Sequence, residues 1–563
     1  MFNNKILLLV MLVIFISCDN EETSYTNSNI DESLAERVVT AIATKSDEEN
    51  RHDCWTINES EPADYADFEG SITLGREMEI PQSIDHMKTA WQHIQRNNLF
   101  PNVPNPVKTN KLYVRFLPKN QNQFLELERY DSNLDLFDFP LHYEFEPTSA
   151  QHDTYRDSSV SLETPNAQYT VVDHNYIFPS FVAYEILKEL YMPDEDTTIS
   201  EELVDAMEII AENVANGKSP LIGLENKSAK WRPQGRVRVI DYSEGEPTHE
   251  QAVPVRGVHV MVRRGLKWSW GQTDQYGEFI VKKEFKKKVH YNVRWSNHEW
   301  YTILGSSVNR AWYFGPKKEG DWDLLIDGTK QAYYAQINRV AYHAFYGDNY
   351  GATRPMSNKP GNDRIFIRAF KRASKKDVLA YFYIRPPHAI SVFDRKLENP
   401  DIPLYGEKYD KLYASLYKTV IHEFGHAMHR NKMLAEGNVQ LSDLEARVIE
   451  TWGRGVEVEL IRTVYPEEHK RIVNTIHDCN NGNSIYTYLV KDLIHPNGID
   501  YGMDPLNPSY QPDHAVFTLG DIDDALSGTH TWEEWNDKLR NGLSESEIMQ
   551  LDAWFDYWDT VCD

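Results

Sequence analysis

The sequence predicts a multidomain α+β protein, because its hydrophobic pattern changes character twice along the 563 residues. A stretch that mixes strand-like and helix-like patterns comes first, short alternating strands follow, and helical periodicity dominates the last part. We therefore expect an N-terminal α/β module over residues 55–232, a central β-sandwich over 233–325 and a mainly helical domain over 326–563. The length agrees with this division, since a domain typically has ~150 residues.

Composition narrows the class of protein. Hydrophobic residues make up 41% and charged residues 26% of the chain, which is ordinary globular usage and excludes a wholly disordered or multispan membrane protein. The 86 acidic residues against 59 basic ones give a net charge of −27, and such a field repels phosphate backbones. Nucleic acid is therefore not an expected partner.

The first residues predict export. Residues 1–17 contain one basic residue, Lys5, followed by an unbroken apolar run from Ile6 to Ile16. A helix that spans a bilayer needs ~20 residues, so this run has the length of the apolar part of a signal peptide. We expect residues 1–17 to be removed as a signal peptide.

The end of this segment, Phe15-Ile16-Ser17-Cys18, resembles a bacterial lipoprotein signal. The resemblance implies that Cys18 carries lipid and that the polar residues of 18–54 form a tether. The acidic residues directly after Cys18 also resemble export signals, which implies a lipid-anchored protein of the outer membrane or the cell surface. The alternative is an ordinary secretory signal with a chance cysteine.

The cysteine count limits the cross-links. Four cysteines without a CxxC pair predict neither a disulfide framework nor a thiolate zinc site. If Cys18 carries lipid, then Cys54, Cys479 and Cys562 can form one disulfide and leave one thiol. The sequence leaves this pairing open, although Cys479 and Cys562 both lie in the C-terminal part.

Three segments of the N-terminal module have a clear pattern. We expect a strand from Lys111 (KLYVRFLPK), a helix over 120–130 and a second strand from Leu134 (LDLFDFPL). The module is either a binding module or a prosegment-like cover for the rest of the chain.

The central segment alternates between apolar and polar residues in short runs. Strands are expected to begin at Arg236, Gly257, Glu278 and His290, with turn signals between them, which is typical of a small β-sandwich. The segments Gly235-x-Val237, Gly257-Val258-x-Val260 and Thr273-Asp274-x-x-Gly277-x-Phe279 resemble the transthyretin-like regulatory module of secreted peptidases. The resemblance implies a spacing role without chemistry, with Gly277 in a tight turn.

The last part of the chain is expected to combine helices with a few strands. Apolar spacing predicts a helix over 328–345 and another over 409–433, and strands are expected from Arg364, Leu379 and Ala389. Strands followed by a helix are a common order in metallopeptidase catalytic domains.

The helix over 409–433 contains the HExxH sequence His422-Glu423-Phe424-Gly425-His426. Histidines four residues apart share a helix face, so both imidazoles can bind one Zn²⁺ per chain at ~2.0–2.1 Å. Glu423 then lies beside the metal, where it can deprotonate a water molecule as the general base. The sequence therefore predicts His422 and His426 as metal ligands and Glu423 as the catalytic residue.

A catalytic zinc ion needs a third protein ligand. The metzincin pattern is excluded, because Lys432 and His429 stand where it requires a histidine and a glycine. The motif and the segment after it instead resemble the gluzincin zinc peptidases, which implies a glutamate from the next helix. Glu445 and Glu450 are the candidates, and they lie ~140° apart around a helix, so they cannot both face the metal.

Glu450 is the preferred third ligand and Glu445 is the alternative. The spacing of the aminopeptidase branch of gluzincins favours Glu445, which comes nineteen residues after the second histidine. The residues from Ser442 to Glu445, however, form a capping-box pattern, in which Glu445 would turn back to the backbone of Ser442. Glu450 is followed by Gly453 and Gly455, and glycines inside a helix indicate close packing on a neighbour.

Other side chains are candidates for supporting roles. Arg454 could orient Glu450 or bind substrate, or it could only pair with Glu457 along the helix. His429 is expected either near the metal without binding it or exposed. A peptidase also needs a donor for the tetrahedral oxyanion, and the candidates are Tyr486, Tyr488, His477 and His495.

The motif and the resemblance together imply a lipid-anchored zinc metallopeptidase that acts on protein or peptide substrates. The alternative is a surface binding lipoprotein of a nutrient-uptake system that keeps HExxH as a relic, with a missing third ligand or a closed metal site. A purely structural zinc ion at the HExxH helix is disfavoured, because closed sites favour cysteine ligands and this helix offers none.

Overall fold

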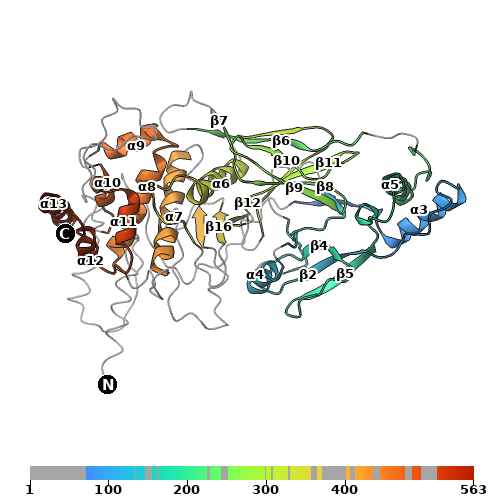
Figure 1. Ribbon diagram of the computed structural model, residues 1–563, viewed down its shortest axis with the longest axis horizontal. Helices are drawn as coiled ribbons and strands as arrows, with labels where there is room; N and C mark the ends of the chain where they lie inside the picture. Colours follow the sequence, from blue (N-terminus) through green and yellow to red (C-terminus); the bar gives the residue numbers. More distant parts are fainter. Residues whose placement is uncertain are drawn as a thin grey trace, which may run out of the picture.

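The chain has a mixed α+β fold, as predicted. The described elements follow the long axis of the molecule, from an N-terminal segment at one end, through paired sheets, to the C-terminal helices at the other (Figure 1). The computed structural model describes residues 72–131, 133–145, 155–160, 164–224, 229–242, 251–297, 299–305, 309–327, 330–356, 364–370, 401–405, 413–434, 444–475, 485–495 and 517–562.

The N-terminal segment is built around the antiparallel sheet β4-β2-β5. The predicted strand from Lys111 and the predicted helix after it are confirmed, and the Asn120 side chain caps that helix by accepting the backbone N–H of Gln123 at 3.0 Å. Its elements are β1 (Leu74–Glu77), α3 (Ile84–Arg96), β2 (Lys111–Leu117), α4 (Gln121–Tyr130), β3 (Tyr143–Phe145), β4 (Gln168–Asp173), β5 (Ala183–Leu190), η3 (Pro193–Glu195) and α5 (Glu201–Ala215).

The strand predicted from Leu134 is wrong, because residues 134–141 form only an isolated bridge between Phe137 and Tyr169. The alternation of apolar residues is real, since Phe137 and Phe139 are both fully buried. Side chains partly replace a strand ladder here: the Leu141 N–H donates to the Tyr113 hydroxyl at 2.9 Å. The alternating pattern therefore marks a buried segment that is not a regular strand. Residues 134–141 are called the strap below.

Two four-stranded sheets, called the paired sheets below, form the centre of the molecule. One has the order β10-β6-β15 with β7 also on β6, and the other has the order β14-β11-β8-β9. Val237 and Val239 of the first sheet share a core with Val260 and Val262 of the second. The strands are β6 (Gln234–Asp241), β7 (Gln251–Pro254), β8 (His259–Arg264), β9 (Lys267–Gln272), β10 (Glu278–Ile280), β11 (Val289–Arg294), β14 (Trp312–Lys318) and β15 (Trp322–Ile326).

The tight turn expected at Gly277 is present. Gly277 has a φ of +75°, and the Asp274 side chain accepts the backbone N–H groups of Tyr276 and Glu278 at 2.8 and 2.9 Å. A Cβ atom on Gly277 would lie 2.4 Å from the Val237 carbonyl oxygen. Only glycine fits this turn without a backbone shift.

The N-terminal segment covers the outer face of the second sheet. Phe137 and Phe139 of the strap pack with Met261, Trp312 and Phe314 of that sheet. Because Val260 and Val262 face the opposite core, this sheet is buried on both faces.

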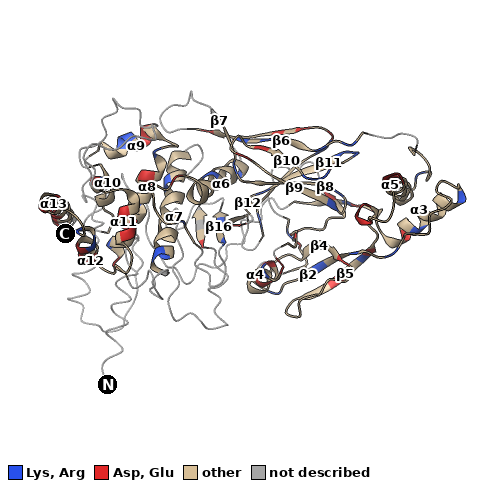
Figure 2. Ribbon diagram, viewed as in Figure 1, with Lys and Arg blue, Asp and Glu red and all other residues tan. Residues whose placement is uncertain are grey.

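Charged contacts accompany this packing. Arg310 is buried and pairs with Asp138 and Glu128, and its backbone N–H donates to Asp138 at 2.8 Å. Acidic residues of α5 also pair with Arg264 of β8 and Lys267 of β9, and Lys287, in the loop before β11, lies 2.6 Å from Glu212. Figure 2 shows basic and acidic residues on both sides of this junction.

The C-terminal part combines helices with the sheet β12-β13-β16-β17, in which β13, β16 and β17 are parallel. The predicted helix over 328–345 and the predicted strand from Arg364 are confirmed as α6 and β16, whereas β17 was not predicted. The elements are β12 (Ser296–Asn297), β13 (Tyr301–Leu304), α6 (Lys330–Tyr346), β16 (Ile365–Phe370), β17 (Ile402–Tyr405), α7 (Tyr413–Leu434), α8 (Ala446–Ile461), α9 (Pro466–Val473), α10 (Leu489–Ile494), α11 (Leu519–Ala525), α12 (Trp532–Leu539) and α13 (Glu545–Cys562).

A buried polar junction fixes the paired sheets to the helices. Asp241, at the end of β6, accepts the Tyr465 hydroxyl at 3.0 Å and the Arg339 guanidinium at 2.7 Å. Tyr465 precedes α9 and Arg339 lies on α6. One carboxylate therefore connects three elements of different parts of the chain.

Several predictions fall on residues outside the described ranges. These are the signal peptide, Cys18 and its tether, the strands from Leu379 and Ala389, and the cysteines at 54 and 479. Within the described ranges, no helix has both the length and the apolar character needed to cross a membrane.

Candidate metal centre

Helices α7 and α8 pack closely through glycines. A Cβ atom on Gly425 of α7 would lie 3.1 Å from the Gly453 Cα atom and 3.2 Å from the Val456 Cβ atom, both on α8. The Trp452 indole N–H donates to the Gly425 carbonyl at 2.9 Å and ties the two helices together at this point. The close packing that the sequence predicted for Gly453 is therefore confirmed, with α7 as the neighbour.

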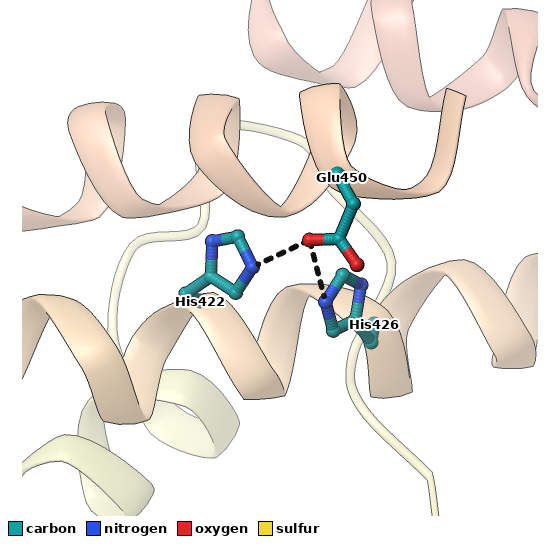
Figure 3. Close-up of side chains that lie close together, drawn as sticks. All are labelled: His422, His426 and Glu450. Atoms are coloured by element: carbon teal, nitrogen blue, oxygen red, sulfur yellow. Dashed lines mark hydrogen bonds and ion pairs between the residues drawn. The ribbon is translucent and has the colours of Figure 1, made fainter. Parts of the chain in front are cut away.

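His422, His426 and Glu450 converge at this contact between α7 and α8 (Figure 3). The Glu450 Oε2 atom lies 3.1 Å from His422 Nε2 and 3.6 Å from His426 Nε2. All three residues are at most 1% exposed. Burial alone would raise the pKa of Glu450, but the neighbouring His426 and His422 lower it to about 2, so its carboxylate is ionised at neutral pH.

The geometry fits a zinc ion. Ligand atoms of a tetrahedral zinc ion at ~2.0–2.1 Å lie ~3.3 Å from one another, and the two distances from Glu450 bracket this value. Two imidazoles and one carboxylate are also a ligand set that leaves a fourth position for water or substrate.

Gly453 makes room for this ligand set. A Cβ atom at position 453 would lie 2.9 Å from the Cε1 atoms of both His422 and His426. Any larger residue would push the two imidazoles, so glycine at this position preserves the arrangement.

Glu457 lies on the other side of His422. Its Oε2 atom is 3.5 Å from His422 Nδ1, whereas His422 Nε2 points to Glu450. A carboxylate at Nδ1 favours the tautomer that presents the Nε2 lone pair to a metal. Burial raises the pKa of Glu457, but Arg454 and His422 outweigh this effect and lower it.

Arg454 pairs with Glu457 along α8. Its Nη1 atom donates to Glu457 Oε2 at 2.7 Å, so the expected intrahelical pair is present. The sequence did not single out Glu457 as the partner of a histidine. The available signal was its position seven residues after Glu450, which returns to nearly the same helix face.

Glu445 does not join the histidines. The expected capping box is wrong, since α8 begins at Ala446 and Glu445 is its N-cap without a side-chain cap bond. The Glu445 carboxylate instead accepts the backbone N–H of Trp532 at 2.7 Å, at the start of α12. Of the two candidate glutamates, the structure brings only Glu450 to His422 and His426.

The remaining candidates take different positions. His429 is fully buried, which excludes the exposed one of its two expected positions, and burial together with His426 lowers its pKa to about 3. The Tyr486 ring lies 6.3 Å from the His422 ring, between centroids. Arg454 lies 5.8 Å above the Tyr486 ring and 5.5 Å above the Tyr488 ring. His477 lies outside the described residues, and His495 belongs to another cluster that is described below.

Glu423 lies on α7 between the two histidines in sequence and is 2% exposed.

No protein-family model, no curated protein and no solved structure matches this chain. The chemistry of the site therefore rests on the geometry of α7 and α8 alone.

Proposed function

We propose that the chain is a zinc metallopeptidase of the gluzincin type, with His422, His426 and Glu450 as zinc ligands and Glu423 as the general base. The observation that carries the proposal is the convergence of two imidazoles and one buried, ionised carboxylate at the HExxH helix. The close approach of both imidazoles to Gly453 supports the proposal, because a Cβ atom at this position would disturb both histidines.

The proposed reaction is the hydrolysis of a peptide bond. A bound zinc ion would supply Lewis acidity, which polarises the substrate carbonyl and lowers the pKa of water. Glu423 would accept a proton from the attacking water and pass it to the leaving amine. Glu457 would hold His422 in the required tautomer, and Arg454 would hold Glu457 in place.

Tyr486 is the first candidate for the oxyanion donor. Its ring is near that of His422, and the adjacent Arg454 guanidinium favours the phenolate-like charge that develops as a hydroxyl donates strongly. Tyr488 lies farther along the chain, before α10, and is the second candidate.

The other parts of the chain receive supporting roles in this proposal. Lipid on Cys18 would anchor the protein in the outer membrane or at the cell surface, and the paired sheets would act as a transthyretin-like spacer. Asp241 at the end of β6 supports the spacer role, because it fixes the sheets to α6 and to the residue before α9.

The test is metal content and peptide cleavage, measured on the chain from Cys18 onward. Wild type is compared with Glu423→Gln, Glu450→Ala and the control Glu445→Gln, using a mixed-peptide library as substrate. We expect Glu423→Gln to keep its zinc and lose cleavage, Glu450→Ala to lose one zinc ion and cleavage, and Glu445→Gln to keep both. A wild type without cleavage of any peptide would favour the surface binding lipoprotein instead.

A further inference from the structure

A second group of metal-binding side chains lies outside the proposed active site. Glu459 of α8, His469 of α9 and His495 after α10 place ligand atoms within 4.8 Å of one another. We propose that these three residues bind a second divalent transition-metal ion of the zinc type, which fastens α9 and the end of α10 to α8. This inference does not depend on the proposed peptidase activity.

The two groups are separate sites on one helix. Glu459 follows Glu450 by nine residues, which places it ~13.5 Å farther along α8 and about 180° around it. Glu450 faces α7, whereas α9 and α10 pack against α8 and bring His469 and His495 to the other group (Figure 1). One ion cannot serve both groups.

The distances within the second group suit a shared ion. The Glu459 Oε1 atom lies 2.8 Å from His495 Nε2, and the rings of His469 and His495 are 5.5 Å apart between centroids, at 76° to each other. Two imidazoles and one carboxylate are ligands that zinc, cobalt, nickel and iron(II) accept. The single negative charge of Glu459 would offset part of the charge of the ion.

Burial provides the second argument. His469 is fully buried, and among the described residues neither of its ring nitrogens has a hydrogen-bond partner. His495 is 2% exposed, and its Nδ1 atom also has no partner within the described part of the chain. Buried polar atoms are nearly always satisfied in folded proteins, and a metal ion would satisfy a nitrogen of His469.

The competing interpretation is a hydrogen-bonded pair without metal, in which the Nε2–H group of His495 donates to Glu459. This pair satisfies Glu459 and one nitrogen of His495, but it gives His469 no partner. The His469 ring, on α9, nevertheless makes an edge-to-face contact with the His495 ring. The metal-free pair does not explain why His469 lies beside His495, whereas a shared metal ion does.

The location of the group gives it a structural role. Helix α9 has only eight residues, and a helix of this length is not stable without tertiary contacts. An ion held by α8, α9 and the residue after α10 would supply such a contact for both short helices.

The experiment counts metal ions on the chain from Cys18 onward after removal of metal with a chelator and reloading with Zn²⁺. We expect two zinc ions per chain for wild type, one for Glu450→Ala, one for His469→Ala and two for the control His93→Ala, which removes an α3 histidine far from both groups. His469→Ala with the same zinc content as wild type would overturn the proposal.

A second measurement covers the case in which His469→Ala does not fold. The Glu450→Ala variant, which lacks a ligand of the first site, is titrated with Zn²⁺ and with Co²⁺ while its melting temperature and visible spectrum are recorded. We expect this variant to bind one ion at the second site, with a rise in its melting temperature and, for Co²⁺, a visible absorption band. No binding would leave the metal-free pair and overturn the second site, whereas loss of cleavage alone would concern only the proposed peptidase.

Discussion

The two ring nitrogens of His422 have different neighbours. Nε2 faces Glu450 and Nδ1 faces Glu457, which in turn is held by Arg454. A carboxylate behind a metal-binding histidine orients the ring and raises its basicity. At the scale of one residue, we therefore expect metal binding at the proposed site to depend on Glu457, which contacts a proposed ligand.

The substitution Glu457→Gln tests this dependence. It keeps the shape of the side chain but removes its charge, and we expect zinc binding at the first site to weaken by about 10–100-fold. Competition with a chelator of known affinity measures the change. Glu445→Gln is the control, because Glu445 lies on the same segment but contacts the backbone of Trp532. Equal zinc affinities for both variants would contradict the role of Glu457.

The sequence predicted part of this site. HExxH singled out His422, Glu423 and His426, and the glycines after Glu450 favoured the glutamate that the structure places beside the two histidines. The sequence did not identify Glu457 as the group behind His422 and considered it only as a partner of Arg454. Its contact with His422 depends on the distance between α7 and α8, which is set by packing.

Helices α7 and α8 approach each other closely because Gly425 and Gly453 meet. Neither glycine is required by a turn, since both lie inside helices, where glycine costs ~1 kcal/mol relative to alanine. At the scale of these elements, the cost is offset by a contact that brings Glu450 to the histidines.

The substitution Gly453→Ala tests this contact. The added Cβ atom would displace the imidazoles of His422 and His426, so we expect weaker zinc binding and a loss of cleavage although every ligand remains. Gly455→Ala is the matched control on the same helix. Its Cβ atom would meet the Val490 side chain, so it should destabilise the fold by ~1–3 kcal/mol while the zinc content is unchanged. Zinc content and urea unfolding are measured for both variants, and normal zinc affinity in Gly453→Ala would contradict the prediction.

Errors in the predicted elements have a common cause. The capping box before α8 fits a local pattern, but Glu445 accepts a hydrogen bond from Trp532, which is far away in the sequence. The alternation after Leu134 likewise fits a strand, but its side chains and carbonyls meet the paired sheets: Arg263 donates to the Leu141 carbonyl at 2.8 Å. Local patterns identified α4, α6 and β2, and α4 begins where the Asn120 side chain caps it.

At the scale of the molecule, the N-terminal segment and the paired sheets form one buried junction. Glu128 and Asp138 of the segment pair with Arg310, which is fixed next to β14. Burial raises the pKa of Glu128, but Arg310 and Arg364 outweigh it and hold the pKa below its ordinary value of 4.5. The segment is therefore attached through an ionised carboxylate.

This attachment predicts acid sensitivity. A carboxyl group with a lowered pKa in the folded protein stabilises the fold above about pH 4.5, and this contribution is lost as the pH falls through the folded-state value. We expect Glu128→Gln to lower the free energy of unfolding by ~1.5–3 kcal/mol at pH 7, with a smaller difference below pH 4.5. Urea unfolding, followed by tryptophan fluorescence at several pH values, measures the free energy of unfolding of both proteins.

The control for this prediction is Glu185→Gln. Glu185 also pairs with an arginine, Arg115, but its side chain is 50% exposed, so its effect should be near zero at every pH. A Glu128→Gln variant whose stability differs from wild type by the same amount at pH 7 and pH 4 would contradict the assigned role.

The double burial of the sheet β14-β11-β8-β9 has a consequence for the time course of folding. The contact between Asp138 and Arg310 spans 172 residues, so at ~5–20 residues per second the strap is synthesised roughly 9–34 s before its partner. During this interval Phe137 and Phe139 have no sheet to cover. We therefore expect the first part of the chain to reach its final structure only after β14 has emerged, so that it stays open to aggregation or to chaperones during this interval.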